Sequence, residues 1–354
     1  LGASLLLSGC GPAGGSQGAF DASSEENGKL KVAVTLFPYY DFVRQIAGDQ
    51  VDLQMVIPAG MDSHSFEPTP ADIRTIQHAD VLISNGGTME HWLEDTLGAL
   101  DTSNMTIVTM MDYVDTVEEE IVEGMEDVGH DHDHAHSHAA ADDHDHSHET
   151  PEEHAAHAQE ADDHDHSDYV DHDGHEEAIE YDEHIWTSPV NAMALCRAIC
   201  DTLCEADPDN ADGYRARLEG YLDELQALDN TFRDIVDGAA RRLVVFGDRF
   251  PLLYFCKEYD LDYRAAFHGC AGDTEPSLAT LKYLIDLVGA EDIPVVYTIE
   301  LSSQKVSNAI AETTGAQVRT FHSCQTVSRA EFDGGATYIS LMTANAAVLK
   351  EGLS

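Results

Sequence analysis

The sequence predicts an α/β protein of two doubly wound lobes, each a parallel sheet with flanking helices, joined by one long helix. Short apolar runs alternate with segments of helical periodicity over residues 29–114, and the same alternation returns after Gly238. Between these halves lies a tract whose apolar residues recur at a spacing close to 3.6. Alternating strands and helices favour a parallel sheet covered by helices over an antiparallel sandwich.

The first half begins its alternation at Lys29. Each predicted strand is a short apolar run with turn residues at its ends, which is the pattern of a strand buried on both faces. The predicted strands are residues 31–37, 51–57, 79–84 and 105–109. The predicted helices are residues 39–47, 72–78 and 89–100.

The second half follows two predicted helices. Ser188-Pro189 opens a helix through Leu203, because proline is favoured in the first helical turn. Asp207-Pro208 starts a helical tract to residue 238, on the order of 35 Å long and enough to run along both lobes. The predicted strands that follow are residues 243–246, 263–266, 295–299 and 318–321. The predicted helices are residues 250–258, 277–288, 302–313 and 338–350.

A histidine-rich segment separates the two halves. Residues 130–175 hold fourteen of the twenty histidines, interleaved with aspartates and without any lysine or arginine. Imidazole is the commonest protein ligand for borderline transition metals, so the segment indicates a metal-collecting loop. A segment this polar cannot bury enough apolar surface to offset its ordering entropy, so we expect it to be disordered. The alternative is a solvated charge run without metal contact.

The N-terminal residues indicate export. Leu7-Ser8-Gly9-Cys10 resembles a bacterial lipobox, in which Cys10 would carry the lipid. The alternative is an ordinary signal cleavage site with an incidental cysteine. No later segment holds about 18 uninterrupted apolar residues, so we expect no membrane span after the signal. We therefore expect an extracytoplasmic protein, lipid-anchored to the outer face of a bacterial cytoplasmic membrane or periplasmic.

Charge and cysteine content narrow the possible partners. The formal net charge of −49 excludes nucleic acid as a partner. Cys196, Cys200 and Cys204 share one helical face, where core-facing thiols are favoured over a metal site. Cys270 and Cys324 follow predicted strands of the same half and are candidates for a disulfide, although the sequence alone cannot give the pairing.

These observations divide the chain into six segments. Residues 1–28 are the signal end, lipobox and tether, and residues 115–180 are the disordered His/Asp-rich loop. The folded segments are 29–114 (N-terminal α/β lobe), 181–206 (end of that lobe), 207–238 (linking helix) and 239–354 (C-terminal α/β lobe).

Four motifs carry a resemblance to a known family. They are GMDSHSFEPTPAD at residues 60–72, ADVLISNG at 79–86, EHWL at 90–93 and DEHIWTSP at 182–189. With these motifs, the chain resembles the solute-binding lipoproteins of zinc and manganese ABC transporters from Lys29 to its C terminus. The histidine-rich segment lies where zinc members of the family carry theirs.

The resemblance implies a set of metal ligands. It maps ligating histidines onto His64 and His184, and onto His322 at the position where manganese members often have aspartate. Where the family has His or Glu, this chain has Gly247, so the third position does not transfer. Asp248 and His268 are possible substitutes, although Asp248 is favoured as a helix cap or a partner of Arg249.

The resemblance also implies a function. It implies a protein that captures Zn²⁺ in a cleft between the lobes and delivers it to the permease and ATPase of an ABC importer. A nitrogen-rich ligand set favours zinc, and Mn²⁺ remains the second possible cargo. A metal-dependent adhesin or metal store is a competing function, and a zinc hydrolase is a less favoured one. The sequence has no His-Glu-x-x-His run or nucleophile elbow, so we expect no enzyme, and we expect a monomer.

Overall fold

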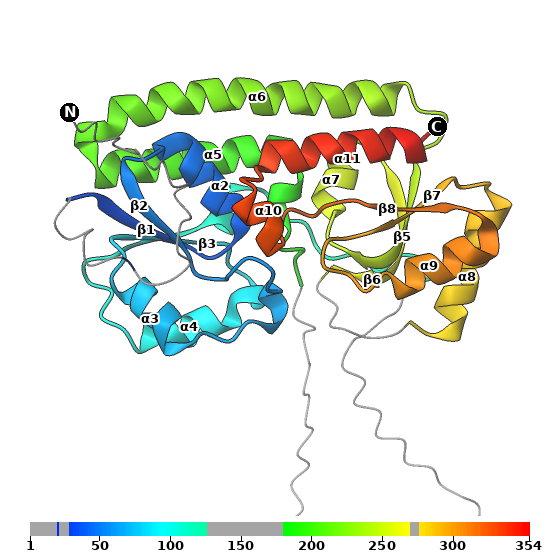
Figure 1. Cartoon of the computed structure of the whole chain (residues 1–354), viewed down its shortest axis with the longest axis horizontal. Coiled ribbons are helices and arrows are strands. Elements are labelled where there is room, and N and C mark those ends of the chain that lie inside the picture. Colours follow the sequence, from blue (N-terminus) through cyan, green and yellow to red (C-terminus); the bar gives the residue numbers. More distant parts are fainter. Residues whose placement is uncertain (1–19, 21–27, 126–179, 270–275) are drawn as a thin grey trace, which may run out of the picture. The chain divides into compact units, whose positions relative to one another are not determined.

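The computed structural model describes residue 20 and residues 28–125, 180–269 and 276–354. These residues form two four-stranded parallel sheets with the same strand order, shown in Figure 1. The predicted fold class is therefore confirmed. Cys10, Cys270 and the histidine-rich residues 130–175 lie outside the described residues.

The first sheet has the order β2-β1-β3-β4. Its strands are β1 (Leu30–Val34), β2 (Val51–Met55), β3 (Val81–Ser84) and β4 (Thr106–Thr109). Its helices are α2 (Phe37–Ala47), α3 (Pro70–Gln77), α4 (His91–Gly98) and α5 (Pro189–Ala206). Thr69 and Asp72 form a capping box at the start of α3, and Ser188 caps α5 by accepting from the Asn191 amide.

The second sheet has the order β6-β5-β7-β8. Its strands are β5 (Leu243–Phe250), β6 (Asp262–His268), β7 (Val295–Thr298) and β8 (Gln317–Thr320). Strand β5 runs four residues past its predicted end, with a shift of register between Phe246 and Arg249. Phe250, predicted to start a helix, ends the strand instead, because the residue before Pro251 favours extended backbone.

The helices of the second lobe are α7 (Leu253–Glu258), α8 (Leu278–Ala290), α9 (Lys305–Thr314), α10 (Arg329–Asp333) and α11 (Tyr338–Gly352). Helix α9 begins three residues later than predicted. Leu301 and Gln304 have φ values of 57° and 58°, a left-handed conformation that ordinary helical residues do not adopt. The sequence patterns do not predict helix α10, although Ser328 and Glu331 give it a capping box.

The predicted long helix is α6 (Ala211–Asp237), which packs against α2 and α5 of the first lobe and against α11 of the second (Figure 1). Its buried side chains recur at helical spacing and include Tyr214, Tyr221, Leu225, Leu228, Phe232 and Val236. One hydrophobic core cluster contains buried residues from both sheets, so the lobes share apolar packing as well as a helix. A smaller cluster lies under α8 and α9.

Short 3₁₀ helices fill several connections. They are η1 (Ser63–Ser65), η2 (Thr88–Glu90), η3 (Met110–Tyr113), η4 (Ile185–Thr187) and η5 (Pro208–Asn210). No helix among the described residues is long and apolar enough to cross a membrane.

Residues 115–125 correct one predicted boundary. The composition assigns them to the disordered loop, but residues 117–119 among them pair with the chain that returns at residue 180. The Glu119 amide donates to the Glu180 carbonyl at 2.9 Å, and the Asp182 amide donates to the Val117 carbonyl at 2.9 Å. Tyr254 of α7 also contacts both sides of this antiparallel stem: its hydroxyl accepts from the Val117 amide and donates to the Asp182 carbonyl.

The described cysteines are buried free thiols: Cys196, Cys200, Cys204, Cys256 and Cys324. The predicted core position of the three α5 cysteines is confirmed. The predicted disulfide between Cys324 and Cys270 stays a prediction, because Cys270 lies outside the described residues.

Candidate metal site

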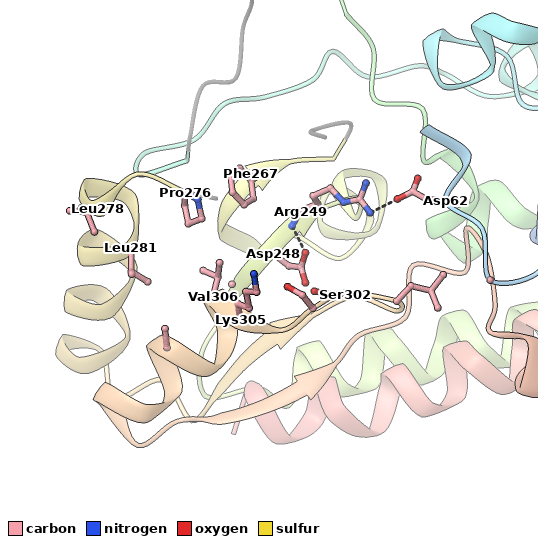
Figure 2. Close-up of a pocket in the computed structure, with 15 residues that line it drawn as sticks. Asp62, Asp248, Arg249, Phe267, Pro276, Leu278, Leu281, Ser302, Lys305 and Val306 are labelled. Carbon is pink, nitrogen blue, oxygen red and sulfur yellow. Dashed lines mark hydrogen bonds and ion pairs between the residues drawn. The ribbon is translucent and has the colours of Figure 1, made fainter. Parts of the chain in front are cut away.

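His64 lies on η1, in the connection from β2 to α3. Asp62 begins this turn and accepts a hydrogen bond from the His64 amide at 2.9 Å. The other carboxylate oxygen of Asp62 accepts from Arg249 Nη2 of the second lobe at 2.7 Å, as Figure 2 shows. Arg249 therefore ties the backbone that carries His64 to strand β5.

His184 lies between the antiparallel stem and α5. Its side chain is fully buried. The His184 amide donates to Asp182 Oδ1 at 2.8 Å, and the His184 carbonyl accepts from the Thr187 hydroxyl at 2.7 Å. These bonds fix the backbone on both sides of the imidazole, immediately before the Ser188 cap of α5.

The structure brings His64 and His184 together. Their ring centroids are 5.8 Å apart, with the ring planes inclined at 42°. His64 Nε2 and both ring nitrogens of His184 are buried without a hydrogen-bond partner. Asp182 Oδ1 is 3.4 Å from His184 Nδ1, but its hydrogen bond goes to the His184 amide. Because buried nitrogens are normally paired, these unpaired nitrogens fit a bound cation.

Electrostatics favour the neutral form of His64. Burial lowers the pKa of His64 to about 4, with the neighbouring His184 acting in the same direction and Asp62 opposing it. Burial also opposes ionisation of Asp62, but Arg249 and the hydrogen bond from His64 lower its pKa overall. At neutral pH His64 therefore keeps a lone pair for a metal ion.

His322 follows β8, and its ring, unlike that of His184, has a hydrogen-bond partner. Its amide donates to Asn345 Oδ1 at 2.7 Å, and its Nδ1 accepts from the Cys324 amide at 2.9 Å. A neutral imidazole that accepts at Nδ1 carries its proton on Nε2, so Nε2 is a donor in this arrangement. His322 Nε2 is buried without a partner. Among the described contacts, no hydrogen bond or ring contact joins His322 to His64 or His184.

Glycine at position 247 has a steric cause. A Cβ atom there would lie 2.6 Å from Ser307 Cα and 2.7 Å from Ser307 N, both backbone atoms of α9. The Ser307 hydroxyl also donates to the Gly247 carbonyl at 2.9 Å. Helix α9 therefore occupies the space that a ligating side chain at position 247 would need.

The two predicted substitutes for this ligand have different surroundings. Asp248 accepts from the Thr298 hydroxyl at 2.6 Å and from the Arg249 amide at 2.9 Å, so its carboxylate is bound within the second sheet. His268 is the last residue of β6, and its Nδ1 lies 3.0 Å from Glu119 Oε1. Within residues 28–125, 180–269 and 276–354, no group of three or more His, Cys, Asp or Glu side chains is gathered closely enough to hold a metal ion.

A cavity of about 830 Å³ opens beside this region, at the carboxyl end of β5 and the start of α9 (Figure 2). Its lining includes Asp62, Asp248, Arg249 and Lys305, together with apolar side chains of α8. None of the predicted histidine ligands lines it. Asp62, which caps the turn that carries His64, and its partner Arg249 both line this cavity.

Two acids that contact the histidine-bearing segments were not singled out by the sequence patterns. Glu183 accepts from the Thr88 and Met89 amides, so the residue beside His184 anchors this segment to the first lobe. The sequence signal that could have identified Glu183 is its position next to the predicted ligand His184. Glu119 stands in a run of three glutamates, and nothing in that run distinguishes it from Glu118 and Glu120.

Comparison with known proteins identifies a family for this chain. The family model of the zinc-uptake complex component A, periplasmic, matches residues 32–352. The chain belongs to this family.

Two curated relatives are similar to this zinc-uptake family member over most of its length. It is 28% identical to the high-affinity zinc uptake system protein ZnuA of Bacillus subtilis, over 99% of this chain and 94% of that protein. It is 26% identical to the zinc-binding lipoprotein AdcA of Streptococcus pneumoniae, over 92% of this chain but only 56% of AdcA. The chain thus spans little more than half of AdcA.

A solved structure gives the same result for the fold. The crystal structure of the metal-dependent lipoprotein YcdH from Bacillus subtilis has a TM-score of 0.67 and 26% identity. The match covers 92% of this chain and 99% of that one. The fold is therefore similar to that of this metal-dependent lipoprotein over nearly its whole length.

Proposed function

We propose that this protein is the extracytoplasmic binding component of a zinc importer, and that Zn²⁺ is its cargo. The observation that carries the proposal is the pair of buried imidazoles, His64 and His184, with ring nitrogens that have no hydrogen-bond partner. Neutral imidazole nitrogen suits zinc, whereas manganese prefers carboxylate and carbonyl oxygen. Membership of the zinc-uptake family supports the same cargo.

The proposed role is binding and release without chemical change to a substrate. Zinc would be held by His64, His184 and a third protein ligand, for which the family resemblance implies His322, and would pass to a permease and ATPase in the membrane. Lipid on Cys10 would keep the protein, acting as a monomer, at the outer face of the membrane. The histidine-rich segment at residues 130–175 would raise the local concentration of zinc.

Zinc affinity tests the assignment of the pair. We expect His64→Ala and His184→Ala each to lower zinc affinity at least about 100-fold at pH 7.5, measured by competition with a zinc chelator. Each substitution removes one metal–imidazole bond and so lowers the binding free energy of the ion. His78→Ala is the matched control, because His78 is an exposed histidine at the end of α3. Unchanged tight binding in both site variants would refute the proposal.

Deletion of residues 126–179 tests the role of the histidine-rich segment. We expect the deletion variant to bind fewer zinc ions per chain in isothermal titration while it retains one tight site, because the stem at residues 117–119 and 180–182 remains. Loss of the tight site together with the weak ones would show that the folded lobes do not bind zinc by themselves.

A further inference from the structure

The zinc site lacks one family ligand, and the structure shows where a replacement can come from. This inference rests on the proposed function. Position 247 cannot hold a ligand, because α9 packs its backbone against Gly247. The carboxylate of Asp248 is held within the second sheet, because one oxygen accepts from the Thr298 hydroxyl and the other from the Arg249 amide. A third protein ligand therefore has to come from another element.

The matching topology of the lobes points to strand β6. In the order β2-β1-β3-β4 and the order β6-β5-β7-β8, the strands β2 and β6 occupy equivalent edge positions. His64 lies in the connection that leaves the carboxyl end of β2, and His268 is the last residue of β6. Ligands of open α/β sheets lie at the carboxyl ends of the strands, so both histidines are on the ligand-binding edge of their own sheet.

Glu119 gives His268 the hydrogen bonding of a metal ligand. Glu119 Oε1 lies 3.0 Å from His268 Nδ1, and it also accepts from the Gly269 amide at 3.1 Å. A carboxylate that accepts from Nδ1–H sets the tautomer with the lone pair on Nε2 and fixes the ring orientation. At His322 the nearest carboxylate oxygen, Glu300 Oε2, is 3.6 Å from Nδ1, and Nδ1 instead accepts from the Cys324 amide at 2.9 Å.

The Glu119–His268 pair adjoins the two imidazoles of the proposed site. A Cβ atom on Gly269 would lie 3.0 Å from His184 Cε1, so the residue after His268 is in contact with the His184 ring. The Glu119 carboxylate also acts to raise the His64 pKa, against the larger effect of burial. His64, His184, Glu119 and His268 are thus neighbours, although no three of the potential ligands among the described residues yet converge on one point.

We propose that His268 Nε2 is the third protein ligand of the zinc site and that Glu119 positions it, in place of the ligand lost at Gly247. Zinc binding then draws His268 toward His64 and His184. Glu119 belongs to the stem that leads to the histidine-rich segment, so that stem supplies part of the site itself.

Cobalt(II) substitution in the full-length protein tests this assignment. The absorption bands of Co²⁺ between about 500 and 700 nm report the number and type of ligands, which a purely structural defect outside the site leaves unchanged. We expect His268→Ala to lower zinc affinity at least about 30-fold and to change the Co²⁺ spectrum. We expect Glu119→Gln to weaken zinc binding by about 10-fold or more, the size of effect known for lost ligand-orienting carboxylates.

Glu120→Gln is the matched control for Glu119→Gln. It lies next along the same stem but contacts Lys257 and Tyr263 rather than a histidine. We expect its zinc affinity to stay within threefold of the wild type. Circular dichroism of each metal-free variant shows whether the variant is folded, and so whether weaker zinc binding comes from a lost ligand or from unfolding.

The outcomes separate this inference from the proposed function. If His268→Ala binds zinc within threefold of the wild type with an unchanged Co²⁺ spectrum, while His64→Ala loses tight binding, His268 is not a ligand and the proposed function stands. If His322→Ala alone, and not His268→Ala, gives the loss and the spectral change, the third ligand is His322 and our assignment is overturned. If His64→Ala and His184→Ala also bind normally, the proposed function itself fails.

Discussion

The two lobes share one strand order but differ at the carboxyl ends of their sheets. In the first lobe, the connection after β2 ends in a capped 3₁₀ turn that holds His64 close to His184. In the second lobe, α9 packs so closely on β5 that only glycine fits at position 247. The carboxyl end of the first sheet therefore has room for a candidate ligand after its edge strand, whereas the central strand β5 of the second sheet excludes a side chain at position 247.

The largest expected effect tests the exclusion at position 247. We expect Gly247→Ala to lower the free energy of unfolding by about 3 kcal/mol, because the added methyl overlaps the Ser307 backbone, which cannot move as a side chain can. Urea denaturation measures the change. Gly220→Ala on α6 is the control: a Cβ there meets nothing within 4 Å, so we expect unchanged or higher stability. Equal stability of both variants would mean that α9 yields easily and that close packing does not exclude a side chain from position 247.

The next prediction compares two glutamates that follow equivalent strands. Glu90 follows β3, and Glu300 follows β7. Burial raises the pKa of Glu90 to about 7, well above its value in an unfolded chain. The folded protein therefore binds more protons than the unfolded chain between about pH 4.5 and 7, and stability falls as pH rises through that window. We expect Glu90→Gln to be more stable than the wild type at pH 8 by on the order of 2 kcal/mol.

That difference has a definite pH dependence. It should be nearly gone at pH 4.5, where Glu90 is protonated in the folded state and half protonated in the unfolded chain. Chemical denaturation at pH 4.5, 6 and 8 measures it. Glu300→Gln is the comparison variant. Glu300 accepts from the Ser323 amide at 2.7 Å, so this substitution takes an anionic acceptor away from that amide. A Glu90→Gln stability gain that is the same at every pH would show that the carboxylate charge is not its source.

A smaller effect concerns the ion pair between the lobes. We expect Arg249→Met to lower the free energy of unfolding by about 1–2 kcal/mol, because Asp62 loses a charged hydrogen-bond partner at a half-buried position. We also expect zinc to dissociate faster, since Asp62 caps the turn that carries His64; stopped-flow chelation measures this rate. Arg215→Met removes an exposed pair with Asp212 and should change neither quantity measurably. An unchanged dissociation rate in Arg249→Met would mean that the ion pair between the lobes has no effect on zinc release.

The smallest effect tests the contact between Gly269 and His184. A methyl group at position 269 would press on His184 Cε1 and on the Phe250 carbonyl, each 3.0 Å away. We expect Gly269→Ala to weaken zinc binding about fivefold, or about 1 kcal/mol, by shifting the imidazole. Gly289→Ala on α8 is the control, because a Cβ there meets nothing within 4 Å. Stronger zinc binding in Gly269→Ala would mean that His184 is poorly oriented in the wild type.

The sequence predicted the two lobes and the long helix because their signals are local. Apolar runs such as residues 79–84 and the periodic residues of α6 need no distant partner to be recognised. The sequence also predicted that His64 and His184 belong together, but through a family resemblance and not through spacing. Nothing in the residues alone brings position 64 to position 184.

The rest of the site depends on contacts between distant segments. Glu119 reaches His268 across 149 positions in the chain, and no pattern in the three consecutive glutamates distinguishes it. The bond from the Cys324 amide to His322 Nδ1 sets a tautomer, which composition cannot reveal. The packing of Ser307 on Gly247 explains the missing ligand only once α9 is placed. Sequence patterns thus locate candidate ligands, whereas tertiary contacts select among them.

The antiparallel stem has a consequence for how such proteins can vary. Its two strands join residues 117–119 to residues 180–182 by backbone hydrogen bonds, so both ends of the intervening peptide are fastened at one place on the folded body. The entropic cost of closing a flexible loop rises only about 0.6 kcal/mol for each doubling of its length. Homologous chains can therefore lengthen, shorten or exchange the peptide between these ends at little cost to folding, and the same place offers a fusion point for a reporter domain.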